Sequence, residues 1–258
     1  MTNEKTADSS KIEGRPDEIR DGEVSLPVMV YRPSSANPVA AVILCPGGMQ
    51  KGMLESLDWL ATQLATAGIL ALAITWRDSS PAHDPQDIDL AIDWLLHQPN
   101  VDPARIGIYG MSRGGNAAFR AAAADSRLRA VATFGPVTNF IQQAEGAAVY
   151  APGRHRMLIG WLGDPVKDRT FYETIQAITY AGQIKQPVLM VHGLYDMHSP
   201  PEQSIWMKEG IEKGGNTKVQ LELIPGMGHF GEVIPNSCGF EQLSAIFVPY
   251  FLEQLAAQ

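Results

Sequence analysis

Short, continuous apolar runs alternate with longer stretches of helical periodicity through most of this chain. The apolar runs lie at residues 39–45, 69–75, 106–109, 128–134 and 187–191, a last strand is expected at 218–224, and the helical stretches lie at 54–67, 87–97, 116–124, 201–213 and 241–257. A continuous apolar run is typical of a strand that is buried on both faces of a parallel sheet. The alternation therefore predicts an α/β fold, with a mostly parallel central sheet flanked by helices.

The pattern changes at three places, and these changes set the expected boundaries. Residues 1–21 are polar and charged, which predicts a flexible N-terminal arm before one domain at 22–258. Residues 23–31 alternate between apolar and polar, and Pro27 favours an antiparallel edge strand. Residues 135–186 exceed the length of an ordinary connection, so we expect a helical insertion, or lid, over the carboxyl ends of the strands. The alternative is a plain crossover with one extra helix.

The run at 106–109 leads into Gly110-Met111-Ser112-Arg113-Gly114, which matches the G-x-S-x-G pattern between a predicted strand and a predicted helix. A nucleophile elbow needs a sharp, strained turn that lifts the serine hydroxyl clear of the sheet, and only small neighbours permit it. Gly110 and Gly114 are such neighbours. The setting favours Ser112 as a nucleophile over a bystander serine in a glycine-rich turn.

A serine hydroxyl needs a base to take its proton before it can attack a carbonyl group. His229 lies in a glycine-rich segment just beyond the last predicted strand, residues 218–224, and therefore at the carboxyl end of that strand. We therefore predict His229 as the base, with His198 as the second choice. His192 ends a buried run, which indicates a structural hydrogen-bonding role.

The base in turn needs a carboxylate that orients its ring. Asp196 follows the run at 187–191 and so also lies at a carboxyl end, whereas the alternatives, Asp164 and Asp168, fall inside the insertion. Because the carboxyl ends of parallel strands meet at one edge of a sheet, we expect Ser112, Asp196 and His229 to meet there.

The negative charge that develops on the substrate oxygen needs preorganised hydrogen-bond donors. The residue after the nucleophile supplies one such donor, so we predict the backbone N–H of Arg113. The second donor belongs to the loop after the first central strand, where Gly47-Gly48-Met49 stands. Either Gly48 or Met49 fills this role, and the sequence leaves the choice open.

Together these segments resemble the α/β-hydrolase fold, and are most similar to the dienelactone-hydrolase-like and prolyl-oligopeptidase-like catalytic domains. The resemblance rests on Pro46-Gly47-Gly48, the lead-in from Val101-Asp102-Pro103 to Ile106, the 110–115 motif, His192-Gly193 with Asp196, and Gly228-His229. It implies a serine hydrolase that works through an acyl-enzyme. Dienelactone hydrolases use a cysteine nucleophile where this chain has Ser112. Prolyl-oligopeptidase relatives carry an N-terminal propeller, for which 258 residues leave no room. We therefore expect an esterase before a peptidase.

The composition limits which ligands, cofactors and cellular locations we expect for this protein. The formal net charge of −8 disfavours nucleic acid as a ligand, because no basic surplus is available to neutralise phosphates. The two cysteines, Cys45 and Cys238, do not form a metal-type spacing, and the predicted chemistry needs neither a metal nor an organic cofactor. No apolar run reaches the length of a membrane span, and the N-terminus lacks the apolar segment of a signal peptide. We expect a cytoplasmic enzyme.

The expected substrate is a small to medium carboxylic ester. A small peptidase or amidase, a thioesterase and a lactonase share the same intermediate, so the predicted residues do not separate them. A non-catalytic ligand-binding protein on the same fold is a further alternative. Arg77, Arg154 and Arg156 are candidates for selecting an acidic group, although exposed arginines are more often plain surface. The oligomeric state is left open.

Overall fold

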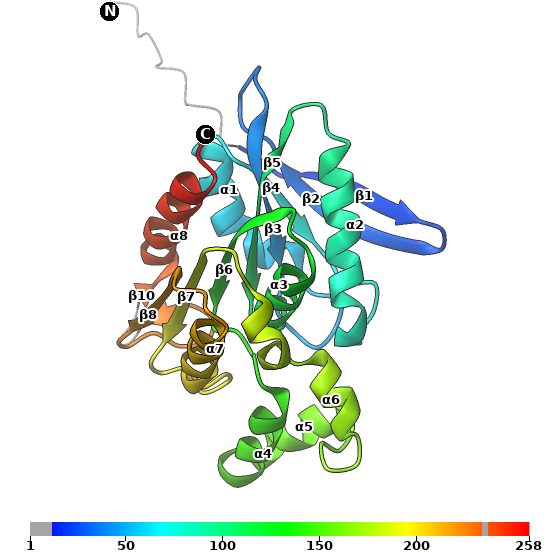
Figure 1. The fold of residues 1–258 in the computed structure, drawn as a ribbon, viewed down its shortest axis with the longest axis vertical. Helices are drawn as coiled ribbons and strands as arrows, with labels where there is room; N and C mark the ends of the chain where they lie inside the picture. Colours follow the sequence, from blue (N-terminus) through cyan, green and yellow to red (C-terminus); the bar gives the residue numbers. More distant parts are fainter. Residues whose placement is uncertain (1–11, 234–236, 258) are drawn as a thin grey trace, which may run out of the picture.

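The computed structural model describes residues 12–233 and 237–257. An eight-stranded sheet with the order β1-β2-β4-β3-β5-β6-β7-β8 forms its centre (Figure 1). The strands are β1 (Arg15–Asp21), β2 (Val24–Tyr31), β3 (Val39–Cys45), β4 (Leu70–Ile74), β5 (Val101–Met111), β6 (Leu128–Phe134), β7 (Val188–Gly193) and β8 (Val219–Ile224). Strands β3 to β8 pair in parallel, whereas β1 and β2 are antiparallel to their neighbours. The predicted α/β fold is confirmed.

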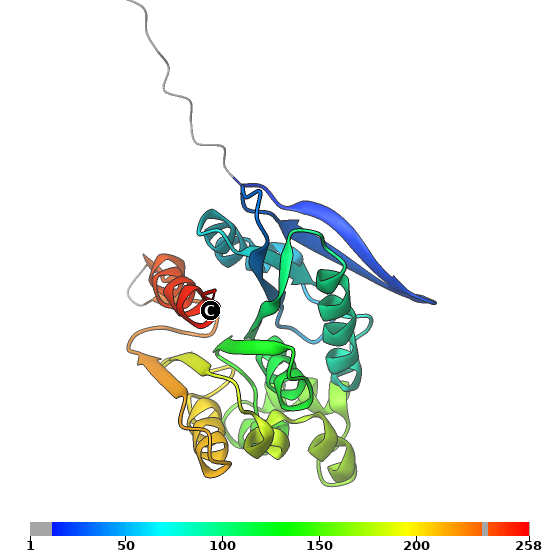
Figure 2. The same ribbon diagram turned by 45° about the horizontal axis from the view of Figure 1, so that its top comes forward.

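Helices cover both faces of the sheet (Figure 2). Helices α1 (Asp58–Thr66) and α8 (Phe240–Gln254) pack on one face, and α2 (Asp84–Leu96), α3 (Arg113–Ala124) and α7 (Glu202–Lys213) on the other. Strand β3 shows why its run is continuously apolar: Ile43 and Cys45 join one core cluster, while Val42 and Leu44 join the opposite one. In residues 12–233 and 237–257, no helix combines the length and apolar character needed to cross a bilayer.

The N-terminal prediction was wrong from Arg15 onward. Residues 1–11 lie outside the described part, but β1 pairs with β2 along its whole length, and Gly22 makes the turn with a φ of +57°. The segment looked like an arm because a hairpin with one solvated face needs few apolar residues, and Ile19, opposite Leu26, is the only buried one in β1. Consequently β2 is not the edge strand that its alternation and Pro27 suggested.

Between β6 and β7 the chain forms the expected helical insertion. It contains α4 (Phe140–Tyr150), α5 (Pro152–Leu162), α6 (Arg169–Ile175) and the 3₁₀ segment η3 (Ala177–Gln183). Helices α4 to α6 gather beyond one end of the sheet (Figure 1). They enclose a small core of their own, separate from the two clusters on the sheet: Val137, Phe140, Ile141, Ala144, Ala147, Leu158, Leu162, Tyr172 and Ile175.

The remaining elements are short and lie in the connections. They are the 3₁₀ segments η1 (Leu54–Leu57) and η2 (Pro81–His83), and the paired strands β9 (Glu232–Val233) and β10 (Ser237–Cys238). Segment η1 precedes α1 and η2 precedes α2, so each lengthens the helical region that follows.

Candidate active site

Ser112 stands at the turn from β5 into α3, with φ 54° and ψ −116°. Among the described residues it is the one non-glycine with a positive φ, a conformation that costs a side chain of this kind free energy. Hydrogen bonds hold it there: the Ser112 N–H donates to Phe134 O, and Ser112 O accepts from the N–H of Gly115 and of Asn116. These bonds begin α3 directly after the serine, so the helix starts earlier than the alanine-rich sequence predicted.

The glycines around Ser112 let three backbone segments approach one another closely. A Cβ on Gly110 would lie well inside van der Waals contact with Gly114 O, and one on Gly114 would collide with Cys45 O. Strand β3, strand β5 and helix α3 therefore meet backbone to backbone beneath the serine. The glycine positions of the motif follow from this packing.

Replacing Gly110 with alanine should lower the free energy of unfolding by about 2 kcal/mol or more, because the atom that the new methyl group meets is backbone and has little room to move. Urea unfolding would measure the change. Gly160→Ala is the matched control: Gly160 lies in α5 with open space around it, so alanine should stabilise by about 0.5–1 kcal/mol. Equal stability of the Gly110 variant and the wild type would contradict the close packing described.

Asp196 and His229, which are distant in sequence, are hydrogen-bonded partners in the structure. His229 Nδ1 lies 2.7 Å from Asp196 Oδ2, and both side chains are buried. Because a carboxylate only accepts, Nδ1 carries a proton, and in the neutral ring Nε2 is then the acceptor on the other side. Gly135 lies against this pair: a Cβ there would be 3.0 Å from Asp196 Oδ2 and 3.3 Å from His229 Nδ1.

The surroundings of Asp196 keep it ionised. Burial by itself raises its pKa, but hydrogen bonds from His192 and His229, the charge of His229 and the Ser199 N–H together hold the pKa well below its ordinary value. His192 Nε2 lies 2.7 Å from Ser199 O and 3.3 Å from Asp196 Oδ2, and its Nδ1 lies 2.7 Å from Ser204 Oγ. This structural role for His192 is the one that its buried position suggested.

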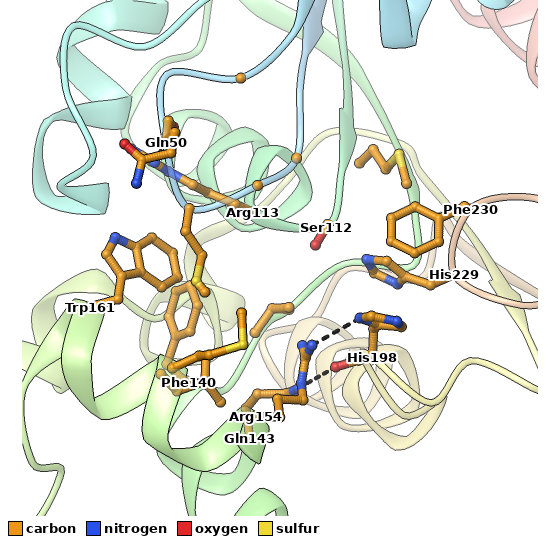
Figure 3. A pocket seen from close by; sticks show the side chains of 18 of the residues that line it. Gln50, Ser112, Arg113, Phe140, Gln143, Arg154, Trp161, His198, His229 and Phe230 are labelled. Carbon is orange, nitrogen blue, oxygen red and sulfur yellow. Dashed lines mark hydrogen bonds between the residues drawn. The ribbon is translucent and has the colours of Figure 1, made fainter. Parts of the chain in front are cut away.

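A cavity of about 740 Å³ lies between the sheet edge and the insertion, and Ser112 and His229 face into it (Figure 3). One wall is the loop after β3, including Gly48 and Met49. A Cβ on Gly47 would be 3.1 Å from Ser112 Cβ, so this loop passes directly beside the serine. Both oxyanion candidates of the loop therefore line the same cavity as Ser112, and the choice between them stays a prediction.

The side chain of Arg113 leaves the cavity and pairs with Asp84 instead. Its Nε lies 2.9 Å from Asp84 Oδ2 and its Nη2 lies 2.6 Å from Oδ1, with both side chains buried. Nη1 also donates to Gln50 O, and the guanidinium group lies 5.3 Å and 5.6 Å from the ring centres of Trp76 and Trp161. Only the backbone N–H of Arg113 is therefore available to an oxyanion. Sequence reasoning missed Asp84, which carries no motif.

The insertion supplies the opposite wall of the cavity. Its side chains there are mostly apolar, namely Val137, Phe140, Met157, Leu158 and Trp161, together with Gln143 and Arg154. The acid alternatives Asp164 and Asp168 contact each other inside the insertion, where the Asp164 N–H donates to Asp168 Oδ2, and they do not line the cavity.

His198 also lines the cavity, stacked on His229 with ring centres 5.2 Å apart. Burial, the charge of His229 and the charge of Arg154 lower the pKa of His198. His198 was the second choice for the base, but Asp196 Oδ1 accepts from its backbone N–H rather than from its ring. In the described part of the chain, no group of three or more His, Cys, Asp or Glu side chains could hold a metal ion.

The fold places this protein in the class of the α/β-hydrolases. The chain belongs to the prolyl oligopeptidase family, whose sequence profile matches residues 73–255. Solved structures with a similar fold include the Pyrococcus horikoshii acylaminoacyl peptidase, at a TM-score of 0.82 and 16% identity over 97% of this chain. The Butyrivibrio proteoclasticus protein Est1E matches at a TM-score of 0.75 and 19% identity over 95% of this chain.

These relatives differ in length. The chain covers all of Est1E, but only 43% of the acylaminoacyl peptidase and 40% of a puromycin-hydrolysing peptidase of Mycobacterium tuberculosis, which matches at a TM-score of 0.81, 17% identity and 96% of this chain. An uncharacterised 31.7 kDa protein of Escherichia coli is 30% identical over 102 residues, which is 35% of either chain. The likeness to dienelactone hydrolases stays a prediction.

Proposed function

We propose that this protein hydrolyses carboxylic esters through an acyl-enzyme, with Ser112 as nucleophile, His229 as base and Asp196 as its orienting carboxylate. The observation that carries the proposal is the convergence of a strained serine and a carboxylate-paired histidine on one cavity. Strain of this kind persists in a fold where the surrounding structure imposes it, and it is concentrated at functional sites.

In this mechanism Ser112 Oγ attacks the substrate carbonyl while His229 Nε2 takes the proton. The backbone N–H of Arg113 and that of Gly48 or Met49 stabilise the oxyanion. His229 then gives the proton to the departing alcohol, which leaves the acyl group on Ser112. A water molecule reverses the two steps and releases the acid. Asp196 keeps the histidine in the required tautomer throughout.

The lining of the cavity favours an ester over a peptide with a free amino terminus. Among the described residues that line it, none is Asp or Glu, so no carboxylate is available to pair with a substrate ammonium group. The apolar side chains of the insertion suit an uncharged carbon chain. Both features support ester cleavage, although relatives named as peptidases share the fold.

A fluorophosphonate probe tests the proposed machinery. It should label the wild-type protein, because a base-activated serine reacts with such a phosphorus centre. Labelling should disappear in Ser112→Ala and fall by about 10²-fold or more in His229→Ala, since the hydroxyl would lose its base. Intact-protein mass spectrometry gives the extent, and circular dichroism shows whether each variant is folded.

A second comparison separates ester from amide cleavage: kcat/KM for 4-nitrophenyl esters against the matching 4-nitroanilides. Aryl esters are intrinsically reactive, so faster turnover of the esters is not sufficient by itself. It supports the proposal when the labelling by the probe also depends on Ser112. Failure of the folded wild type to react with the probe would instead favour the ligand-binding alternative.

A further inference from the structure

Arg154 differs from the other arginines that the sequence singled out. Arg77 pairs with Asp87, and Arg156 is exposed and does not line the cavity. Arg154 is half-buried near the start of α5 and faces into the cavity, with its guanidinium group beside His198 (Figure 3). Position alone therefore makes it the one of the three that a bound substrate can touch.

The charge of Arg154 has no dedicated counter-ion in the described part of the chain. Its Nη1 lies 2.9 Å from His198 Nδ1, an imidazole nitrogen that accepts the hydrogen bond and adds no negative charge. Its Nε is buried without a hydrogen-bond partner. Asp196 is within electrostatic range, but its oxygens already accept from His229 and from the N–H groups of His198 and Ser199. A partly desolvated guanidinium with unused donors is a binding site for an anion.

Arg154 is also close to the proposed reaction centre. It contacts His198, and His198 stacks on His229, so one imidazole ring separates the guanidinium from the base. Gln143 fixes this arrangement from α4 by donating from Nε2 to His198 O. An anion bound to Arg154 would therefore lie in the same cavity as the carbonyl that Ser112 attacks.

We infer that Arg154 forms a carboxylate subsite, and that the preferred substrates are esters carrying a free carboxylate a short carbon chain away from the scissile carbonyl. The planar guanidinium matches the two oxygens of a carboxylate, whereas the neighbouring apolar wall holds the connecting carbons. This inference names a substrate class for the hydrolysis proposed above and rests on that proposal.

Two esters that differ only at the distant end test the subsite: the 4-nitrophenyl ester of glutaric acid with a free carboxylate, and the same ester capped with a methyl group. The measured quantity is the ratio of their kcat/KM values. We expect the wild type to favour the carboxylate ester by about tenfold or more, and Arg154→Gln to lower that ratio by a similar factor. Arg154→Lys should restore part of it, because the charge returns without the planar donors.

Arg156→Gln is the matched control, since it removes an arginine of the same helix that lies outside the cavity, and it should leave the ratio unchanged. If Arg154 only supported His198, both esters would slow equally and the ratio would stay constant, which would overturn the inference. A wild type without preference for the carboxylate ester would do so as well.

Binding to the Ser112→Ala protein tests the subsite without turnover. Calorimetry should show tighter binding of monomethyl glutarate than of dimethyl glutarate, and Arg154→Gln should remove the difference. Failure of fluorophosphonate labelling would count against the proposed hydrolysis, whereas equal binding of the two glutarates would count against the subsite alone. The two failures are therefore distinguishable.

Discussion

Replacing Ser112 with alanine should lower kcat/KM for ester hydrolysis by about 10⁴-fold or more while the protein stays folded. The change removes the atom that forms the acyl bond, and only oxyanion stabilisation and substrate binding would remain. Steady-state kinetics with 4-nitrophenyl butyrate measure the loss, and thermal unfolding checks the fold. Activity within tenfold of the wild type would exclude Ser112 as the nucleophile.

The same position offers a second readout that does not depend on substrate. Because Ser112 has a φ of 54°, glycine should adopt the backbone conformation at this position with less strain than alanine. We expect Ser112→Gly to be more stable than Ser112→Ala by about 1 kcal/mol or more, with both variants inactive. Both variants lack the hydroxyl group, so their difference in free energy of unfolding reports the backbone conformation alone. A difference near zero would mean that the backbone at residue 112 is not strained.

Replacing Arg113 with leucine should lower the free energy of unfolding by about 3–5 kcal/mol, the largest stability loss we predict. The variant leaves Asp84 buried without its partner, and an unpaired buried charge costs far more than a lost surface ion pair. Urea unfolding measures the loss. Arg77→Leu is the control: its partner Asp87 is also buried but keeps the hydrogen bond from the backbone N–H of residue 77, and Arg77 is partly exposed, so the loss should be smaller.

The cost of losing Arg113 should depend on pH in a defined direction. Burial raises the pKa of Asp84 to about 6, against the opposing hydrogen bonds and charge of Arg113, so removing Arg113 raises it further. A protein with a carboxyl group whose pKa is raised in the folded state loses stability as the pH increases through that pKa. The difference in free energy of unfolding between the wild type and Arg113→Leu should therefore increase above about pH 6. The Asp84→Asn, Arg113→Leu double variant should flatten this dependence, and a difference independent of pH would contradict the assignment.

The sequence was most informative where one local rule decides the outcome. Runs such as 39–45 predicted buried strands correctly, because a strand covered on both faces cannot tolerate polar residues. Ser112 and Asp196 follow buried strands, and His229 follows the edge strand β8, so their position at one edge of the sheet followed from parallel pairing. Their catalytic roles stay a proposal.

Long-range pairing between polar groups could not be predicted in the same way. Asp84 and Arg113 are 29 positions apart, and nothing in either local sequence indicates a buried partner. Strand β1 was missed because only Ile19 of its seven residues is buried. The stacking of His198 on His229, and the contact of Arg154 with His198, depend on how α5 sits against the sheet edge, which no local pattern encodes.

The helical insertion joins the sheet at Gly135, a position that is more constrained than the helices of the insertion. Any side chain at Gly135 would press on Asp196 and His229, whereas the helices beyond it keep a core of their own. Recombination or laboratory grafting could thus exchange the helices between residues 138 and 176 as a cassette, provided that the glycine at its entrance is kept. New substrate ranges would then arise from one side of the cavity, without re-evolving the serine, the histidine or the carboxylate.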